Sequence, residues 1–113
     1  DNESVKMRPL ISKEEASELL DLIPQIGIVE VPMEKKRRDI YRELMATAEP
    51  RDYVSIIKTV GCRREEFKKT RRRLPDIDND AEHTAKSSLY GELAAVLGLS
   101  REEIHNMITE KTL

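Results

Sequence analysis

The stretch 79–98, NDAEHTAKSSLYGELAAVLG, carries the clearest fold signal in this 113-residue chain. Apolar and small side chains recur in it every three to four residues, which places them on one face of an α-helix. The expected buried face consists of Ala81, Ala85, Ser88, Leu89, Leu93 and Val96. Asn79 followed by Glu82 is typical of a capped helix start, and Gly98 is typical of a glycine cap at the other end. We therefore predict a long helix between these caps.

The same spacing recurs toward the N-terminus and predicts an all-α fold, a compact bundle of about five helices. Ser12 followed by Glu15 forms a capping box that opens a first helix, and Pro24 ends it. The stretch 25–31 is apolar and mostly β-branched, but it has no partner strand in the chain. We therefore expect it to be an apolar connector packed on the bundle.

The middle of the chain predicts two further helices, and a last one follows the capping box at residues 100–103. One begins near residues 32–34 and turns inward Ile40, Tyr41, Leu44, Met45 and Ala48. The next begins at Pro50, which suits a first helical turn. Its expected buried face is Tyr53, Ile56, Ile57 and Val60. Gly61 either caps this helix or lies inside a longer one, and residues 63–73 are either helix or loop.

Composition excludes several classes of protein. No apolar run approaches the ~20 residues that a membrane span requires, and no secretory signal pattern opens the chain. The single cysteine cannot form an internal disulfide, which fits a reducing compartment. We therefore expect a cytoplasmic protein with no membrane partner.

No group of residues in the sequence predicts catalysis or a bound metal. Asp76, Asp78 and Asp80 resemble the start of a calcium-binding loop. Ala81 stands where that loop needs glycine, however, and Ser87 stands where it needs a bidentate glutamate. The two histidines and the cysteine have no partners at the spacing of a metal site or a nucleophile. We therefore expect a protein that is not an enzyme and uses no metal or cofactor, with the aspartates forming an acidic helix start.

Charge is distributed unevenly along the chain. Residues 1–34 carry a net −5, residues 35–73 carry +8, and residues 74–113 carry −5. Two basic clusters, 35–38 and 63–73, account for most of the positive charge. If the fold brings them onto one surface, they predict a phosphate-binding platform, because neutralising phosphates releases condensed counterions. The predicted contact residues are Lys35, Lys36, Arg37, Arg38, Arg63, Arg64, Lys68 and Lys69. The alternative is a solvated, internally neutralised surface.

Several stretches have counterparts in one known domain. Val5, Arg8, Ile11 and Ser12 form a V-x-x-R-x-x-I-S pattern, and EEASELLDLI follows it. Further along come YVSIIKTV at 53–60 and SSLYGELAAVLGLSREEI at 87–104. Together these stretches resemble the C-terminal helical domain of CarD-type (CarD/CdnL) bacterial transcription regulators.

The resemblance implies a domain organisation and a function. Residues 1–11 would be the remnant of an interdomain linker and residues 12–113 the helical domain. On this reading, the family's N-terminal Tudor-like domain, which binds RNA polymerase, would be absent from this chain. The family's helical domain sits on promoter DNA at the upstream edge of the transcription bubble. By position, its DNA-contacting arginine pair corresponds to Arg37 and Arg38, and its next basic segment lies near Arg63 and Arg64.

The chain departs from the family at two places. The family inserts a tryptophan into the minor groove, and that residue would fall near Glu34 or Lys35, but this chain contains no tryptophan. Met33 is the nearest apolar side chain that could act as the wedge. The basic segment 63–73 is also longer than the family's connector. A second hypothesis therefore stays open, that of a helical protein-interaction module with no direct DNA contact, which exposure of Ile28, Val29 and Val31 would favour.

Overall fold

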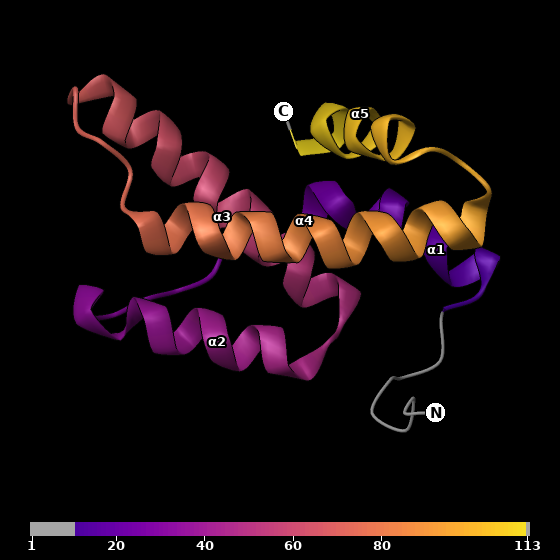
Figure 1. Cartoon of the computed structure of the whole chain (residues 1–113), viewed down its shortest axis with the longest axis horizontal. Coiled ribbons are helices and arrows are strands. Elements are labelled where there is room, and N and C mark those ends of the chain that lie inside the picture. The colour runs from indigo at the N-terminus through magenta and orange to yellow at the C-terminus, as the bar shows by residue number, and fades with distance from the viewer. Residues whose placement is uncertain (1–10, 113) are drawn as a thin grey trace.

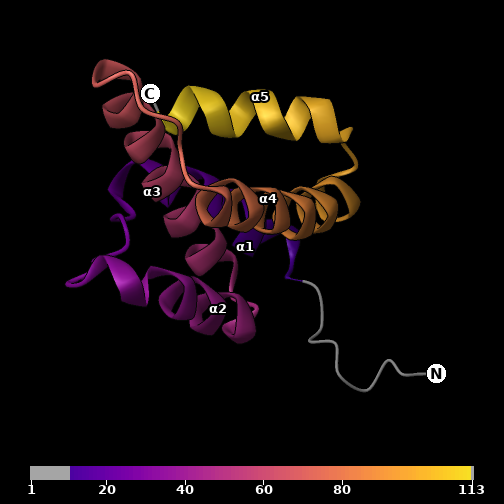
Figure 2. The ribbon, with the colours of Figure 1, turned by 60° about the vertical axis from the view of Figure 1, so that its left-hand side comes forward.

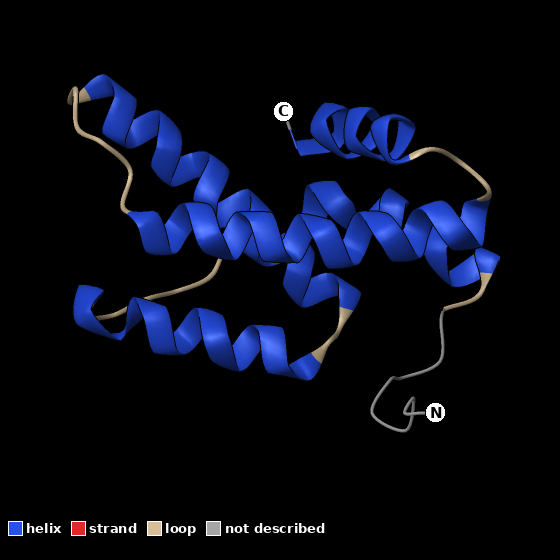
Figure 3. Cartoon of the chain, viewed as in Figure 1, coloured by secondary structure: helices blue, strands red, loops and turns tan. Residues whose placement is uncertain are grey.

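The computed structural model describes residues 11–112 of the chain, and this part is helical without a strand (Figures 1 and 3). Its elements in order are α1 (Lys13–Leu22), η1 (Ile23–Gln25), η2 (Glu34–Lys36), α2 (Arg37–Thr47), α3 (Pro50–Lys69), α4 (Asp76–Leu97) and α5 (Arg101–Thr112). The prediction of an all-α bundle of about five helices is confirmed. The predicted linker, residues 1–11, lies outside the described residues except for Ile11.

The predicted helix ends are largely confirmed. The backbone N–H of Glu15 donates to the Ser12 hydroxyl at 3.1 Å, and the Ser12 N–H donates to the Glu15 carboxylate at 2.9 Å. A matching reciprocal pair joins Ser100 and Glu103 at the start of α5. Gly98 has φ +69° and caps α4 in the left-handed conformation that glycine adopts without steric cost.

The predicted start of α4 is wrong. The helix begins at Asp76, directly after Pro75, and the Pro75 carbonyl accepts hydrogen bonds from the N–H groups of Asp78 and Asn79. Asn79 therefore lies inside the helix instead of capping it. Ser88, predicted to be buried, is exposed. The buried stripe runs in steps of four residues through Ala81, Ala85, Leu89 and Leu93, and Ser88 is rotated away from it.

The structure decides between the alternatives left open for residues 61–73. Gly61 lies inside α3, and the helix continues to Lys69. Arg71 then adopts a left-handed conformation with φ +57°, and the chain turns toward α4. The C-terminal part of α3 thus carries basic residues beyond the packed core, with Phe67 as its partly buried apolar contact.

α3 and α4 form the centre of the bundle. In both ribbon views α5 lies on one side of α4 and α2 on the other (Figures 1 and 2), and in Figure 1 α3 crosses behind α4. The largest fully buried aliphatic side chains come from η1, α3, α4 and α5: Ile23, Val54, Ile56, Val60, Leu89, Leu93, Ile104 and Ile108. Burying such side chains stabilises the fold by roughly 1.5–3 kcal/mol each. This core fixes the ends of α2, α3 and α4 relative to one another.

Between η1 and η2 the chain forms an irregular connector, residues 26–33, that lies against α3. The Val29 N–H donates to the Thr59 hydroxyl at 2.7 Å. The Lys58 ammonium donates to the carbonyls of Ile23 and Ile26 at 2.8 and 2.6 Å. Ile26 is buried, whereas Ile28 remains 51% exposed. The connector is therefore packed on the bundle as predicted, with Val29 and Val31 half-buried and with Ile28 and Met33 exposed.

Candidate nucleic-acid interface

The two basic clusters of the sequence lie at the same end of the molecule. The N-terminal end of α2 and the C-terminal end of α3 are both at the left in Figures 1 and 2. Glu34 in η2 joins them directly, because it accepts hydrogen bonds from Arg37 Nε at 2.8 Å and from Arg63 Nη2 at 3.0 Å. Segments that are nearly thirty residues apart in the sequence therefore meet in the fold.

An ion-pair network made of Glu34, Arg37, Tyr41, Arg63 and Asp78 forms this junction, with Asp78 at its buried end and Glu34 at the surface. Asp78 is fully buried at the start of α4 and accepts from Arg63 Nε at 2.9 Å, Arg63 Nη2 at 3.1 Å and the Tyr41 hydroxyl at 2.7 Å. Arg37, 7% exposed, donates to the Tyr41 hydroxyl at 3.2 Å and to both Glu34 oxygens. Two guanidinium groups thus face two carboxylates. Asp78 and Arg37 are compensated where they are buried, whereas Glu34 pairs with both arginines from the surface, with 62% of its side chain exposed.

The pKa values follow this pairing. The hydrogen bond from Arg37 lowers the pKa of Glu34 below its usual value, against an opposing effect of burial. Burial, followed by the hydrogen bond to Asp78, raises the pKa of Tyr41 to about 12. Burial also acts to lower the pKa of Arg37, but the hydrogen bonds to Glu34 and Tyr41 outweigh it and the pKa rises. At neutral pH the carboxylate of Glu34 is therefore ionised and Tyr41 remains a hydrogen-bond donor.

Arg64 is held by a separate ion pair on α4. Its Nη2 and Nη1 donate to the two carboxylate oxygens of Glu82 at 2.6 and 3.0 Å, a bidentate geometry. Nη2 also donates to the Asn79 side chain at 3.3 Å. Burial acts to raise the pKa of Glu82, but the Arg64 hydrogen bond and the nearby Lys86 outweigh it and lower that pKa. Arg64 therefore joins α3 to α4.

Three of the eight predicted phosphate-contacting residues thus form ion pairs with carboxylates of the same chain. Arg37, Arg63 and Arg64 hold η2, α2, α3 and α4 together, and a phosphate would have to displace Glu34, Asp78 or Glu82 to reach them. We assign them a structural role and leave them out of the contact set proposed below. The sequence does not identify Glu34, Asp78 and Glu82 as the partners of these arginines, because no spacing in the chain reveals which acidic side chain a distant arginine will meet.

The other five predicted contacts remain exposed: Lys35, Lys36, Arg38, Lys68 and Lys69. We call them the cationic end. Within residues 11–112, no carboxylate lies within ion-pairing distance of their charged groups. Lys35, Lys36 and Arg38 come from η2 and the first turn of α2, and the two other lysines come from the last turn of α3. The fold therefore brings unpaired positive charge from two elements to one end.

Two more arginines lie beside this surface and were not among the predicted contacts. Arg72 stacks its guanidinium over the Phe67 ring, 4.2 Å from the centroid, and donates to the Thr70 hydroxyl at 2.9 Å. Arg71 is exposed in the turn after α3. Arg73 differs, because Asp76 accepts its hydrogen bond at 3.0 Å. The sequence identified the stretch 63–73 as basic, but it did not show which of its basic side chains pair with carboxylates and which do not.

Met33 lies directly before η2, and 49% of its surface is exposed. The side chain is therefore accessible next to Lys35 and Lys36. Its assignment as a minor-groove wedge stays a prediction.

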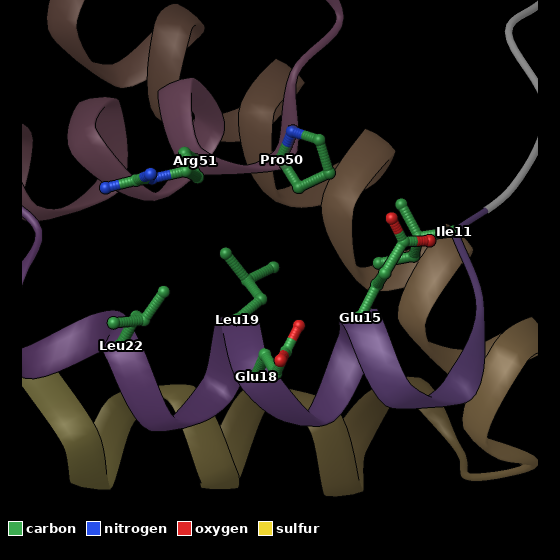
Figure 4. Close-up of a pocket in the computed structure, with 7 residues that line it drawn as sticks. All are labelled: Ile11, Glu15, Glu18, Leu19, Leu22, Pro50 and Arg51. Atoms are coloured by element: carbon green, nitrogen blue, oxygen red, sulfur yellow. The ribbon is translucent and has the colours of Figure 1, made fainter.

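Two apolar grooves lie elsewhere on the surface. One, of about 210 Å³, lies between α1 and the start of α3 (Figure 4). Leu19 and Leu22 of α1 line one side of this groove, and Pro50 and Arg51 of α3 line the opposite side. The other, of about 540 Å³, separates the connector from α2. Neither groove includes a residue of the cationic end.

The described part of the chain offers little for other classes of site. Residues 11–112 contain no group of three histidine, cysteine, aspartate or glutamate side chains placed to hold a metal ion. In the same range, no helix combines the length and the apolar character needed to cross a bilayer. Asp78, in the stretch that resembled a calcium loop, is bound by Arg63.

Comparisons with known proteins do not assign a family. A scan against protein-family models finds no match, and a search of curated proteins finds none either. The likeness to CarD-type regulators therefore stays a prediction that depends on the residues quoted above.

Proposed function

We propose that this domain binds DNA through the phosphate backbone, as the DNA-facing module of an RNA polymerase-associated transcription regulator. The observation that carries the proposal is the cationic end, where five exposed cations from two elements have no carboxylate partner within residues 11–112. Each cation that reaches a phosphate releases condensed counterions, which favours binding at low salt whatever the DNA sequence.

The ion-pair network supports this proposal by fixing the geometry of the surface. Glu34 lies immediately before Lys35 and is bonded to both Arg37 and Arg63. Arg63 lies about 1.4 turns before Lys68 on the same helix. Its bonds to Glu34 and Asp78 therefore fix the position of α3 relative to η2, and with it the two groups of cations. A preorganised surface loses less entropy on binding than two mobile segments would.

Met33 adds an apolar contact with the minor groove to the proposed phosphate contacts. Minor-groove proteins insert apolar side chains, methionine included, between base steps, while basic neighbours contact phosphates. An exposed Met33 two residues before Lys35 has this arrangement. Promoter DNA at the edge of the transcription bubble and RNA polymerase enter the proposal as partners through the resemblance to CarD-type regulators.

The salt dependence of DNA affinity tests the proposal. Five phosphate contacts give a slope of log affinity against log salt of about −4.5 on duplex DNA, which is a roughly 500-fold loss between 50 and 200 mM salt. Fluorescence anisotropy with labelled duplex and forked DNA measures this slope. A flat salt dependence, or no binding at low salt, would contradict the proposal.

A pair of matched double variants localises the contact. Lys35→Glu with Lys36→Glu removes two charges of the cationic end, and we expect at least tenfold weaker binding with a slope reduced by about 2. Lys13→Glu with Arg51→Glu makes the same change in net charge at the starts of α1 and α3. We expect the second pair to weaken binding less than twofold. Equal losses in both pairs would show a diffuse attraction and reject the proposed surface.

A further inference from the structure

The groove between the connector and α2, which we call the connector groove, is lined by both aliphatic and acidic side chains. Its volume is about 540 Å³. Its apolar lining comes from Ile28, Val29, Ile40 and Leu44, and its polar lining from Glu30, Glu43, Thr47 and Ser55. With 51% of its surface exposed, Ile28 has the largest exposed fraction among the large hydrophobic side chains of residues 11–112.

Both walls of the connector groove are fixed by the fold. The connector wall is bound to α3 through the 2.7 Å hydrogen bond from the Val29 N–H to Thr59. The α2 wall is bound to α4 through the 2.7 Å hydrogen bond from Tyr41 to the buried carboxylate of Asp78. The groove is therefore preformed, and a ligand would not have to order either wall.

Charge around the connector groove is negative. Glu30 and Glu43 line it from opposite walls. A neighbouring hollow of about 430 Å³ shares Ser55 with the groove and adds two carboxylates, Glu49 and Asp52, with Arg51 as the one cation in its lining. These carboxylates repel phosphate, so the groove and the cationic end select partners of opposite charge.

We propose that the connector groove is a docking site for a basic, amphipathic segment of a partner protein. Aliphatic side chains of that segment pack on Ile28 and Leu44, and its lysine or arginine side chains pair with Glu30 and Glu43. Amphipathic helices bind apolar grooves in this way, with anchors on one face and charges at the edge. A second copy of the chain fits less well, because its basic stretch 63–73 offers only Phe67 and Leu74–Pro75 as nearby apolar residues, and Phe67 already lies against Arg72.

A synthetic peptide is a direct probe of the proposal. The probe is a fluorescein-labelled helical peptide with leucines at i, i+4, i+7 and i+11 and lysines on the flanking positions. A control peptide carries serine at the leucine positions and keeps every lysine. We expect anisotropy to show saturable binding of the leucine peptide and at least tenfold weaker binding of the serine peptide. Equal binding of the two peptides to the unaltered protein would overturn the proposal, because charge alone would then explain it.

Variants of the protein locate the peptide. Glu30→Lys with Glu43→Lys should weaken the leucine peptide about tenfold, and Ile28→Ser should weaken it several-fold. Glu102→Lys with Glu110→Lys makes the same charge change on exposed positions of α5 and should have less than a twofold effect. Circular dichroism melts check that each variant is folded. Equal losses in both glutamate pairs would overturn the proposal.

Sedimentation of the protein alone tests the competing occupant. A concentration-dependent dimer that Ile28→Ser abolishes would assign the connector groove to a second copy and reject a basic partner segment. A monomer at concentrations far above the peptide dissociation constant supports the proposal.

Discussion

Two sets of cations from the same stretches of sequence have opposite surroundings. Arg37 is buried in the ion-pair network, while Arg38, the next residue, is exposed at the cationic end. Arg63 is bonded to Glu34 and Asp78, whereas Lys68 and its neighbour on the same helix have no such partner among residues 11–112. A basic run in a sequence therefore mixes residues that hold the fold together with residues that face solvent.

The difference follows from helix geometry and from the cost of desolvating charge. Adjacent helical residues point about 100° apart, so when one contacts the bundle the next faces outward. An inward arginine is tolerated only when carboxylates compensate its charge, and Asp78 and Glu34 do so here. Four perturbations test this division of roles.

Removing one partner of the ion-pair network should have the largest effect. Arg63→Ala leaves the fully buried Asp78 with Tyr41 as its remaining hydrogen-bond donor among the five residues of the network. An uncompensated buried charge of this kind costs about 3–5 kcal/mol. Urea denaturation followed by circular dichroism measures the free energy of unfolding. Arg38→Ala is the matched control and should change it by less than about 0.5 kcal/mol. Similar values for the two variants would contradict the assigned roles.

Charge changes on the last turns of α3 should affect DNA binding and leave the fold intact. Lys68→Glu with Lys69→Glu should weaken DNA binding at least tenfold and lower the salt slope by about 2. Glu65→Lys with Glu66→Lys changes exposed residues of the same helix in the opposite direction and should tighten binding several-fold. Anisotropy titrations with labelled duplex measure both changes. If both pairs change affinity in the same direction, α3 does not face the DNA.

Stability should depend on pH through the two glutamates that pair with arginine. The pKa values of Glu34 and Glu82 are lowered from 4.5 in the folded state. The unfolded state therefore binds these protons first as pH falls, so the stabilisation is present above pH 4.5 and is lost below it. Denaturation midpoints between pH 7 and 3 measure the loss. Glu34→Gln with Glu82→Gln should be less stable at pH 7 and should show a shallower decline. An unchanged pH profile in this variant would contradict the pairing.

Replacing Met33 should give the smallest effect, because a single side chain without charge is changed. Met33→Ala should weaken binding to forked DNA two- to fivefold and leave binding to duplex DNA and the salt slope unchanged, since phosphate contacts are retained. Ile28→Ala, on the neighbouring connector groove, is the control and should not alter DNA binding. Equal losses on forked and duplex DNA would show that Met33 is not a wedge.

The fold could be predicted from local patterns, and the candidate site only in part. The capping boxes at Ser12 and Ser100 and the glycine cap at Gly98 are local signals, because each involves residues within one helical turn. Asn79 followed by Glu82 is also a local signal, but it predicted the wrong helix start. Pro75 precedes the actual start at Asp76, so Asn79 lies inside the helix. The connector could be predicted in part. Its apolar character predicted packing, but which of its side chains would stay exposed depended on α2 and α3.

The sequence by itself determined that the chain forms helices, that three of them begin after Ser12, at Pro50 and after Ser100, that one ends at Gly98, and which two stretches concentrate positive charge. Tertiary structure alone decided that Glu34 lies between Arg37 and Arg63, that Asp78 is buried against Arg63, and that five cations remain exposed at one end. The physical reason is the distance along the chain over which each interaction acts. Helix periodicity and capping act within a turn of the chain, whereas the fate of a buried charge depends on a partner brought to it from a distant segment by packing.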